Sequence, residues 1–158
     1  MQLVVFSDSH GNFNALYQLV GKYPGADRFI FLGDGIVEFR FVVATYPEHK
    51  FLAVRGNCDF DFNYEAEDIL QVGERLCFFT HGHTYDVKSN LNKLVGRAGV
   101  LGASVVLFGH THTSLIQNVD GILLLNPGSV SLPRGGPASY GLITITDEGK
   151  VGAEILPL

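Results

Sequence analysis

The sequence is poor in cysteine and in basic residues, and it contains no long hydrophobic run. Its two cysteines, Cys58 and Cys77, can form one disulfide bond at most, and this usage favours reduced thiols in a cytoplasmic protein. No apolar run approaches the ~20 residues that cross a bilayer. The first residues lack the basic segment and cleavage site of a signal peptide. These absences exclude a disulfide scaffold and predict a cytoplasmic protein without membrane association.

Charge is also scarce, and it is acidic on balance. Charged residues make up 17% of the chain, with 11 basic against 16 acidic side chains and a net charge of −5. Because lysine and arginine do not cluster, strong nucleic-acid binding is not expected. Hydrophobic residues reach 46% of 158 residues, which is enough for the core of one domain spanning 1–158.

The first third alternates between two hydrophobic periods. Short apolar runs predict strands over 2–7, 28–32 and 51–54. Between them, helical spacing predicts one helix that Asn12 caps and Gly21 ends, and a second helix over 36–44. This βαβαβ series indicates a parallel sheet with right-handed crossovers.

The remainder is richer in strands. The pattern predicts a strand pair over 64–71 and 74–80 and then an amphipathic helix from Val87 to Ala98. Five further strands are expected over 104–108, 115–118, 122–125, 140–146 and 151–155. The whole chain is therefore expected to be one α/β domain with a mixed or double sheet.

Polar side chains with metal-binding capacity are concentrated at five points. Each point follows the carboxyl end of a predicted strand, the edge where ligands bind in open α/β sheets. The five segments are Asp8-Ser9-His10, Gly33-Asp34-Gly35, Gly56-Asn57-Cys58-Asp59, His81-Gly82-His83 and His110-Thr111-His112. Taken singly, each segment is equally well an ordinary polar loop. Together they predict a site for divalent cations, because mixed imidazole and carboxylate donors suit zinc, iron, manganese or nickel.

These motifs, in this order, resemble the calcineurin-like metallophosphoesterase superfamily. The resemblance covers essentially the whole chain. The small size, the Gly56-Asn57-Cys58-Asp59 form of the third motif, and Asn126-Pro127-Gly128-Ser129 followed by Pro133-Arg134 are similar to the compact prokaryotic YfcE-like phosphodiesterases. The resemblance implies two packed mixed β-sheets flanked by helices, a four-layer α/β/β/α fold.

The resemblance also implies two divalent metal ions. One ion would be held by Asp8, His10 and His112, and the other by Asn57, His81 and His110, with Asp34 bridging both. Manganese is favoured by the resemblance, while nickel, iron and zinc are compatible with the same ligands. A hydroxide bridging the two metals would then hydrolyse a phosphate diester by in-line attack.

Several other residues are candidates for catalytic roles. The superfamily usually has histidine in the third motif, where this chain has Cys58, so slow turnover or a preference for good leaving groups is expected. Asp59 is expected to orient its neighbours, and Arg134 to contact phosphate oxygens. His83 is expected to support a ligand or to face the substrate. Arg55 is a further candidate for phosphate contact.

Two alternatives stay open. A phosphomonoesterase would use the same metal core, but the scarcity of spare cations favours diesters. A Vps29-like protein-binding scaffold would share the fold and have a weak or vestigial metal site. The expected ligand is a small phosphate ester, and exposed edge strands in a small two-sheet domain are compatible with a homodimer.

Overall fold

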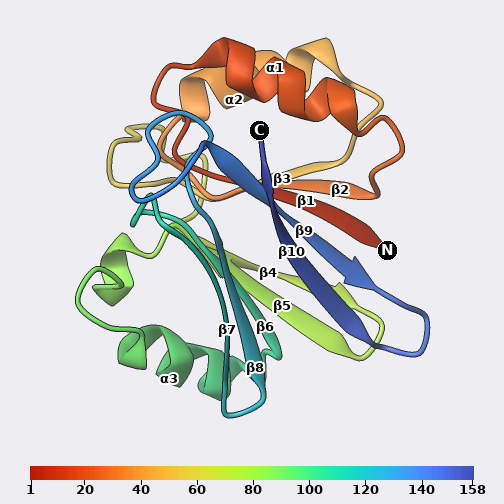
Figure 1. The fold of residues 1–158 in the computed structure, drawn as a ribbon, viewed down its shortest axis with the longest axis vertical. Coiled ribbons are helices and arrows are strands. Elements are labelled where there is room, and N and C mark those ends of the chain that lie inside the picture. Colours follow the sequence, from red (N-terminus) through yellow and green to blue (C-terminus); the bar gives the residue numbers. More distant parts are fainter.

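The computed structural model describes residues 1–158 as two five-stranded sheets packed face to face, with helices on the outer faces (Figure 1). The helices are α1 (Phe13–Lys22), α2 (Ile36–Thr45) and α3 (Asn92–Leu101), with a 3₁₀ turn η1 (His83–Tyr85). The strands are β1 (Gln2–Phe6), β2 (Arg28–Phe31), β3 (Phe51–Ala53), β4 (Glu67–Val72), β5 (Arg75–Thr80), β6 (Val105–Phe108), β7 (Ser114–Val119), β8 (Ile122–Pro127), β9 (Ser139–Ile145) and β10 (Val151–Pro157).

The first sheet has the order β10-β9-β1-β2-β3. Strands β1, β2 and β3 are parallel, as the βαβαβ pattern predicts, and β9 runs antiparallel between β1 and β10. The second sheet has the order β4-β5-β6-β8-β7, in which β5, β6 and β8 are parallel. The carboxyl ends of the parallel strands in both sheets therefore lead into the motif loops.

Three apolar layers separate the four structural layers. Side chains alternate along each strand, so Leu3 and Val5 enter the core between the sheets, whereas Val4 and Phe6 pack under α1 and α2. A smaller cluster fills the space between the second sheet and α3. Figure 1 shows α1 and α2 over one sheet and α3 under the other. The predicted α/β/β/α arrangement is confirmed.

Some predicted boundaries are wrong. The third long helix begins at Asn92 rather than Val87. Val87 is buried because it packs against Gly82 in the preceding loop, so its apolar character comes from tertiary contact and not from a helix face. The ring of His49, a histidine outside every motif, packs among Phe29, Tyr46 and Phe51.

The three α-helices have ten residues each. None of them combines the length and the apolar character that a membrane crossing requires.

Candidate metal centre

The motif loops of both sheets converge on one rim of the molecule. Asp8 and His10 follow β1, and Asp34 follows β2. From the other sheet, His81 follows β5, while His110 and His112 follow β6. Each loop begins where a buried parallel strand ends, so the core fixes the position from which each polar side chain projects.

One group of donors combines Asp8, His10 and His112, whose ligand atoms lie within 4.8 Å of one another. The Nε2 atoms of His10 and His112 are 3.2 Å apart. His112 Nε2 lies 3.2 Å from Asp8 Oδ1, and His10 Nε2 lies 3.8 Å from the same oxygen.

A second group combines Asp34, His81 and His110. His81 Nε2 lies 3.1 Å from His110 Nδ1 and 3.4 Å from Asp34 Oδ2. The same carboxylate oxygen lies 3.9 Å from His10 Nε2 of the first group. Asp34 thus stands between the two groups, where a bridging ligand would be needed.

The hydrogen bonds around the histidines orient lone pairs toward the centre of each group. His81 Nδ1 donates to the Leu32 carbonyl, and His112 Nδ1 donates to the Leu132 carbonyl, both at 2.7 Å. In the neutral rings Nε2 is then an acceptor. Asp8 Oδ1 is buried and accepts no hydrogen bond. Acceptors that face one another repel unless protons or cations lie between them, so this donor set fits divalent metal ions.

The pKa values of the histidines in the site reflect the close approach of these charged and polar groups. Burial disfavours charge on His81, but its hydrogen bond to Asp34 and the charges of both carboxylates prevail and raise its pKa. Contact with the Asp8 carboxylate likewise raises the pKa of His112. Burial, with the charge of His81, lowers the pKa of His110 to about 4. Without a metal, the site therefore holds protons on some histidines and excludes them from others.

The backbone of the site is unusual. Five of the candidate ligands have a left-handed conformation, with φ of 58° at Asp8, 44° at His10, 59° at Asp34, 68° at His110 and 60° at His112. Such conformations cost of order 1–3 kcal/mol each in residues other than glycine, and they cluster at functional sites. The fold thus holds these side chains in orientations that a relaxed loop would not adopt.

Glycines next to the ligands let other side chains approach the backbone closely. A Cβ on Gly56 would lie 2.0 Å from Asp34 Oδ1, and a Cβ on Gly109 would lie 2.1 Å from Ser7 Oγ and 3.0 Å from Asp8 Oδ2. Both positions therefore require glycine for the carboxylates to occupy their observed places.

Asp59 is an anchor beneath the site. Its carboxylate accepts hydrogen bonds from the backbone amides of Asp34, Gly35, Ile36 and Gly56, at 2.7–2.9 Å. It therefore caps α2, whose first residue is Ile36, and joins the loops that follow β2 and β3. In this position Asp59 orients Asp34 rather than pointing to the donor groups.

Asn57 is the one candidate ligand that the structure leaves exposed. Its side-chain amide donates to Cys58 Sγ at 3.2 Å. Cys58 Sγ itself lies within 4.8 Å of ligand atoms of His10 and Asp34. Burial, with the hydrogen bond and charge of Asp34, raises the pKa of the Cys58 thiol to about 11.

The motif Asn126-Pro127-Gly128-Ser129 is hydrogen-bonded to the loops that carry the candidate ligands. Asn126 donates to the Gly109 carbonyl at 2.8 Å and to Thr111 Oγ1 at 3.0 Å. Ser129 Oγ donates to the Asp8 carbonyl at 2.7 Å. The side chains of Asn126 and Ser129 are both fully buried, so they fix the turn in this motif and do not face a substrate.

The remaining candidate residues are His83, Arg134 and Arg55, and they differ in burial. The ring of His83 lies 5.5 Å from that of His81, and its Nδ1 is buried without a partner. Arg134 is exposed, and its backbone amide donates to the His112 carbonyl at 2.8 Å. Arg55 donates to the Tyr64 carbonyl and packs its guanidinium over Phe62.

Glu38 is a supporting residue that sequence reasoning missed. It is buried in the first turn of α2 and accepts hydrogen bonds from Ser9 Oγ at 2.7 Å and from the Gly11 amide at 2.6 Å. It thereby ties the loop that carries Asp8 and His10 to α2. A lone carboxylate within the apolar run of this helix was the available signal.

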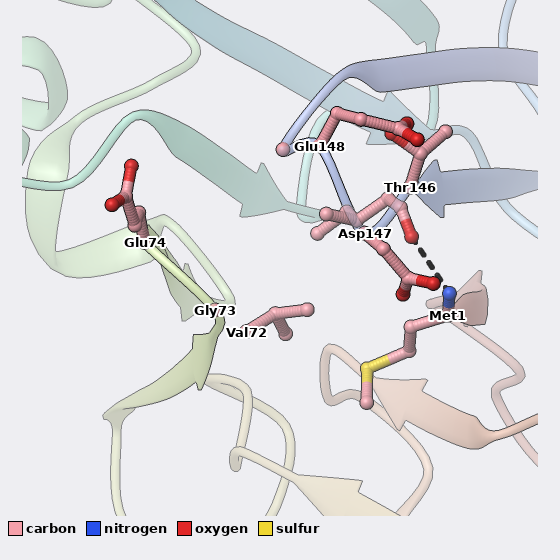
Figure 2. A pocket seen from close by; sticks show the side chains of 9 residues that line it. Met1, Val72, Gly73, Glu74, Thr146, Asp147 and Glu148 are labelled. Atoms are coloured by element: carbon pink, nitrogen blue, oxygen red, sulfur yellow. Dashed lines mark hydrogen bonds between the residues drawn. The ribbon is translucent and has the colours of Figure 1, made fainter.

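A separate cavity of about 590 Å³ lies far from these donors along the strands. It is bounded by the β4–β5 turn, the β9–β10 turn and the chain start (Figure 2). Its polar groups are the carboxylates of Glu74, Asp147 and Glu148 and the amine of Met1, which donates to the Ile145 carbonyl at 2.7 Å. Its lining includes no histidine or cysteine.

Comparison with known proteins agrees with this site and fold. Residues 1–148 match the calcineurin-like phosphoesterase superfamily domain. The chain is 35% identical to the probable metallophosphoesterase YsnB of Bacillus subtilis over 150 residues, covering 94% of this chain and 86% of YsnB. It is 33% identical to the phosphodiesterase YfcE of Escherichia coli over 168 residues, covering 90% of this chain and 87% of YfcE.

Solved structures extend the comparison to the fold. A predicted phosphoesterase from Streptococcus pneumoniae superposes with a TM-score of 0.86 at 29% identity, covering 99% of this chain and 88% of that one. Vps29 of Chaetomium thermophilum superposes with a TM-score of 0.75 at 17% identity, covering 98% and 96%, and shares the fold alone. The chain belongs to the calcineurin-like phosphoesterase superfamily. Members of this family of metallophosphoesterases are hydrolases of phosphate esters.

Proposed function

We propose that this protein is a metal-dependent phosphodiesterase. The observation that carries the proposal is the pair of donor groups that meet at Asp34, each with lone pairs directed inward. Such a site neutralises the charge of a phosphate ester in a protein whose overall charge is negative, because bound cations dominate their local field. The name of the relative YfcE, a phosphodiesterase, supports the same reaction.

The ligands fall into two sets. Asp8, His10 and His112 would hold one divalent ion, and His81 and His110, with Asn57 after a side-chain rotation, the other. Asp34 would serve both. Bound there, the ions supply Lewis-acid activation of the phosphate and a hydroxide nucleophile at neutral pH. Manganese is our preferred metal from the family resemblance.

The residues around the ligands supply orientation and proton control. Asp59 holds Asp34 in place through the backbone of two loops. Burial, with the charge of His81, lowers the pKa of His83, so its ring is neutral at pH 7 and offers a hydrogen bond to the substrate. Arg134 is the exposed cation beside His112 and would meet a non-bridging phosphate oxygen.

The two alternative functions, a phosphomonoesterase and a protein-binding scaffold, would require different features of the site. A phosphomonoester carries one more negative charge and calls for more cations at the rim. Arg134 is exposed beside His112, and Arg55 donates to the Tyr64 carbonyl and packs over Phe62, so the site offers few spare cations, which favours diesters. A scaffold like Vps29 would need no ligand set, yet this chain retains every histidine and aspartate of the proposed ligand set.

Location and assembly complete the proposal. The two cysteines are unpaired, one exposed and one buried, which suits the reducing cytoplasm. The substrate is a small phosphate ester. Edge strands β4 and β7 of the second sheet leave backbone groups without strand partners on one side, so a homodimer would form by covering one of these edges.

The proposal is tested by metal removal and return. The chelator-stripped protein is assayed with bis-p-nitrophenyl phosphate and p-nitrophenyl phosphate, with manganese, nickel, zinc or magnesium added in turn. We expect metal-restored cleavage of the diester in excess of the monoester, and its loss in Asp34→Asn. Absence of turnover with every metal, while calorimetry still detects two bound ions, would favour a scaffold. Absence of metal binding would refute the site itself.

A further inference from the structure

A recess adjoins the candidate metal centre on the side of α2. It has a volume of about 430 Å³, and its walls include Val37 and Arg40 of α2 and Cys58 and Phe60 of the loop after β3. Cys58 belongs to this wall and also to the donor group formed with His10 and Asp34. The recess therefore shares Cys58 with the site at which a phosphate would bind.

Phe60 is exposed, yet the chain on either side of it is fixed. The Phe60 side chain is 84% exposed. Before it, Asp59 accepts hydrogen bonds from backbone amides of two loops. After it, Asp61 pairs with Arg40 at 3.2 Å and accepts from the amide of Asn63. Because the flanking residues are fixed, the backbone at Phe60 has little conformational freedom to lose on binding a ligand.

The apolar surface continues along the outer face of α2. Val37 is 66% exposed and Phe41 is 57% exposed, although the helix already buries Ile36 and Phe39 on its inner face. A surface helix ordinarily presents polar side chains to water. Contiguous apolar side chains beside a polar site are typical of ligand contact.

The charge of the recess restricts what it can accept. Its one cation, Arg40, is neutralised by Asp61, and Asp59 is engaged with backbone amides. The wall is thus suited to an uncharged group and not to a second phosphate. A flat ring would stack on Phe60 and lie against Val37.

We propose that this recess binds an aromatic or flat apolar ester group of the phosphodiester while the phosphate lies at the donor groups. The inference rests on the proposed function and narrows its substrate class to diesters with at least one such group. Phe60 is then a specificity-determining residue.

Binding of two diesters that differ only in their ester groups tests this inference. Diphenyl phosphate and dimethyl phosphate are titrated calorimetrically into the manganese-loaded protein, its Phe60→Ala and Phe60→Tyr variants, and the control Phe62→Ala. Phe62 is 76% exposed but lies outside the recess. We expect Phe60→Ala to weaken diphenyl phosphate binding about 3- to 10-fold, with dimethyl phosphate unchanged. Phe60→Tyr should retain binding, and Phe62→Ala should match the unaltered protein.

The outcomes separate this inference from the proposed function. Equal losses for both diesters, no loss in Phe60→Ala, or no binding of diphenyl phosphate to the unaltered protein would overturn the recess as a binding site. A protein that binds diphenyl phosphate through Phe60 but hydrolyses no diester would refute the proposed catalysis while supporting the recess. Melting curves of Phe60→Ala should be unchanged, because so exposed a ring contributes little packing.

Discussion

Cys58 occupies the position where the superfamily usually has histidine, and its surroundings keep it neutral. Burial and the nearby Asp34 carboxylate raise its thiol pKa to about 11, so at pH 7 it is protonated. A neutral thiol is a weak hydrogen-bond donor. This residue therefore cannot stabilise a departing alkoxide as a histidine cation would.

Replacement of Cys58 tests that conclusion. We expect Cys58→His to raise kcat for diesters with poor leaving groups by up to about 10²-fold, because it restores a positioned proton donor. Diesters of p-nitrophenol should gain much less. The control is Cys58→Ser, which adds no titrating cation and should not accelerate either reaction. Equal rates in the two variants would contradict the role assigned to the missing histidine.

Protons compete with metal ions at the same atoms. In the metal-free protein the pKa values of His81 and His112 are raised, so both rings stay protonated above the ordinary histidine pKa of about 6.5. A metal must displace those protons. Manganese affinity should therefore go on rising as pH increases beyond the ordinary histidine pKa of about 6.5, and level off once both rings are neutral. Calorimetry in two buffers of different ionisation enthalpy measures the proton release, and affinity independent of pH would contradict it.

At the scale of elements, one carboxylate joins α2 to two loops. The hydrogen bonds that Asp59 accepts come from Asp34, Gly35, Ile36 and Gly56. An asparagine would accept through one oxygen only. We expect Asp59→Asn to lower the free energy of unfolding by about 1–3 kcal/mol and to weaken metal binding.

Urea denaturation in the presence of chelator measures the effect of Asp59→Asn without the contribution of the metal. Asp61→Asn is the matched control, since Asp61 pairs with the exposed Arg40, and such pairs contribute about 0–1 kcal/mol. If the two variants were equally stable, Asp59 would be no more than a surface residue of its loop.

The sequence predicts elements well where one local cause dominates. The predicted strand ends lie within three residues of the observed ends, because the apolar runs stop at polar loop residues. The start of α3 was misplaced because Val87, buried against Gly82, follows Asp86 in a left-handed turn that interrupts the helical spacing. Contacts between distant segments have no local signal.

The same distinction applies within the site. The motifs brought the two donor groups to one rim, but the positive φ angles of the ligands were not predictable, since only a small fraction of residues other than glycine adopt them, although aspartate and histidine do so more often than most. Glu38 was missed because it reaches Ser9 across 29 positions of sequence. The hydrogen bond from the exposed Asn57 amide to the adjacent Cys58 sulfur is a local contact that the motif pattern does not signal.

At the scale of the whole molecule, each bound ion would connect the two sheets. Asp8 and His10 belong to the first sheet and His112 to the second, and the other donor group is divided in the same way. Binding to the folded state alone stabilises it by about 2.7 kcal/mol at an ion concentration 100 times the dissociation constant.

We therefore expect manganese to raise the melting temperature and a chelator to reverse the change. Asp34→Asn, which weakens both donor groups, should remove most of the increase. Differential scanning calorimetry with and without the ion measures this. An undiminished increase in Asp34→Asn would place the bound ions elsewhere.

The pairing of β1 with β9 has a consequence for synthesis on the ribosome. All the candidate ligand side chains have been translated by His112, but β1, which pairs with β2 on one side, gains its second partner only when Ser139–Ile145 emerges. The Leu132 carbonyl that fixes the His112 ring, and the Ser129 hydroxyl that holds the Asp8 backbone, also come late. A nascent chain thus carries its ligands for much of its synthesis without the scaffold that orients them. Metal acquisition becomes one of the last events in the maturation of the protein.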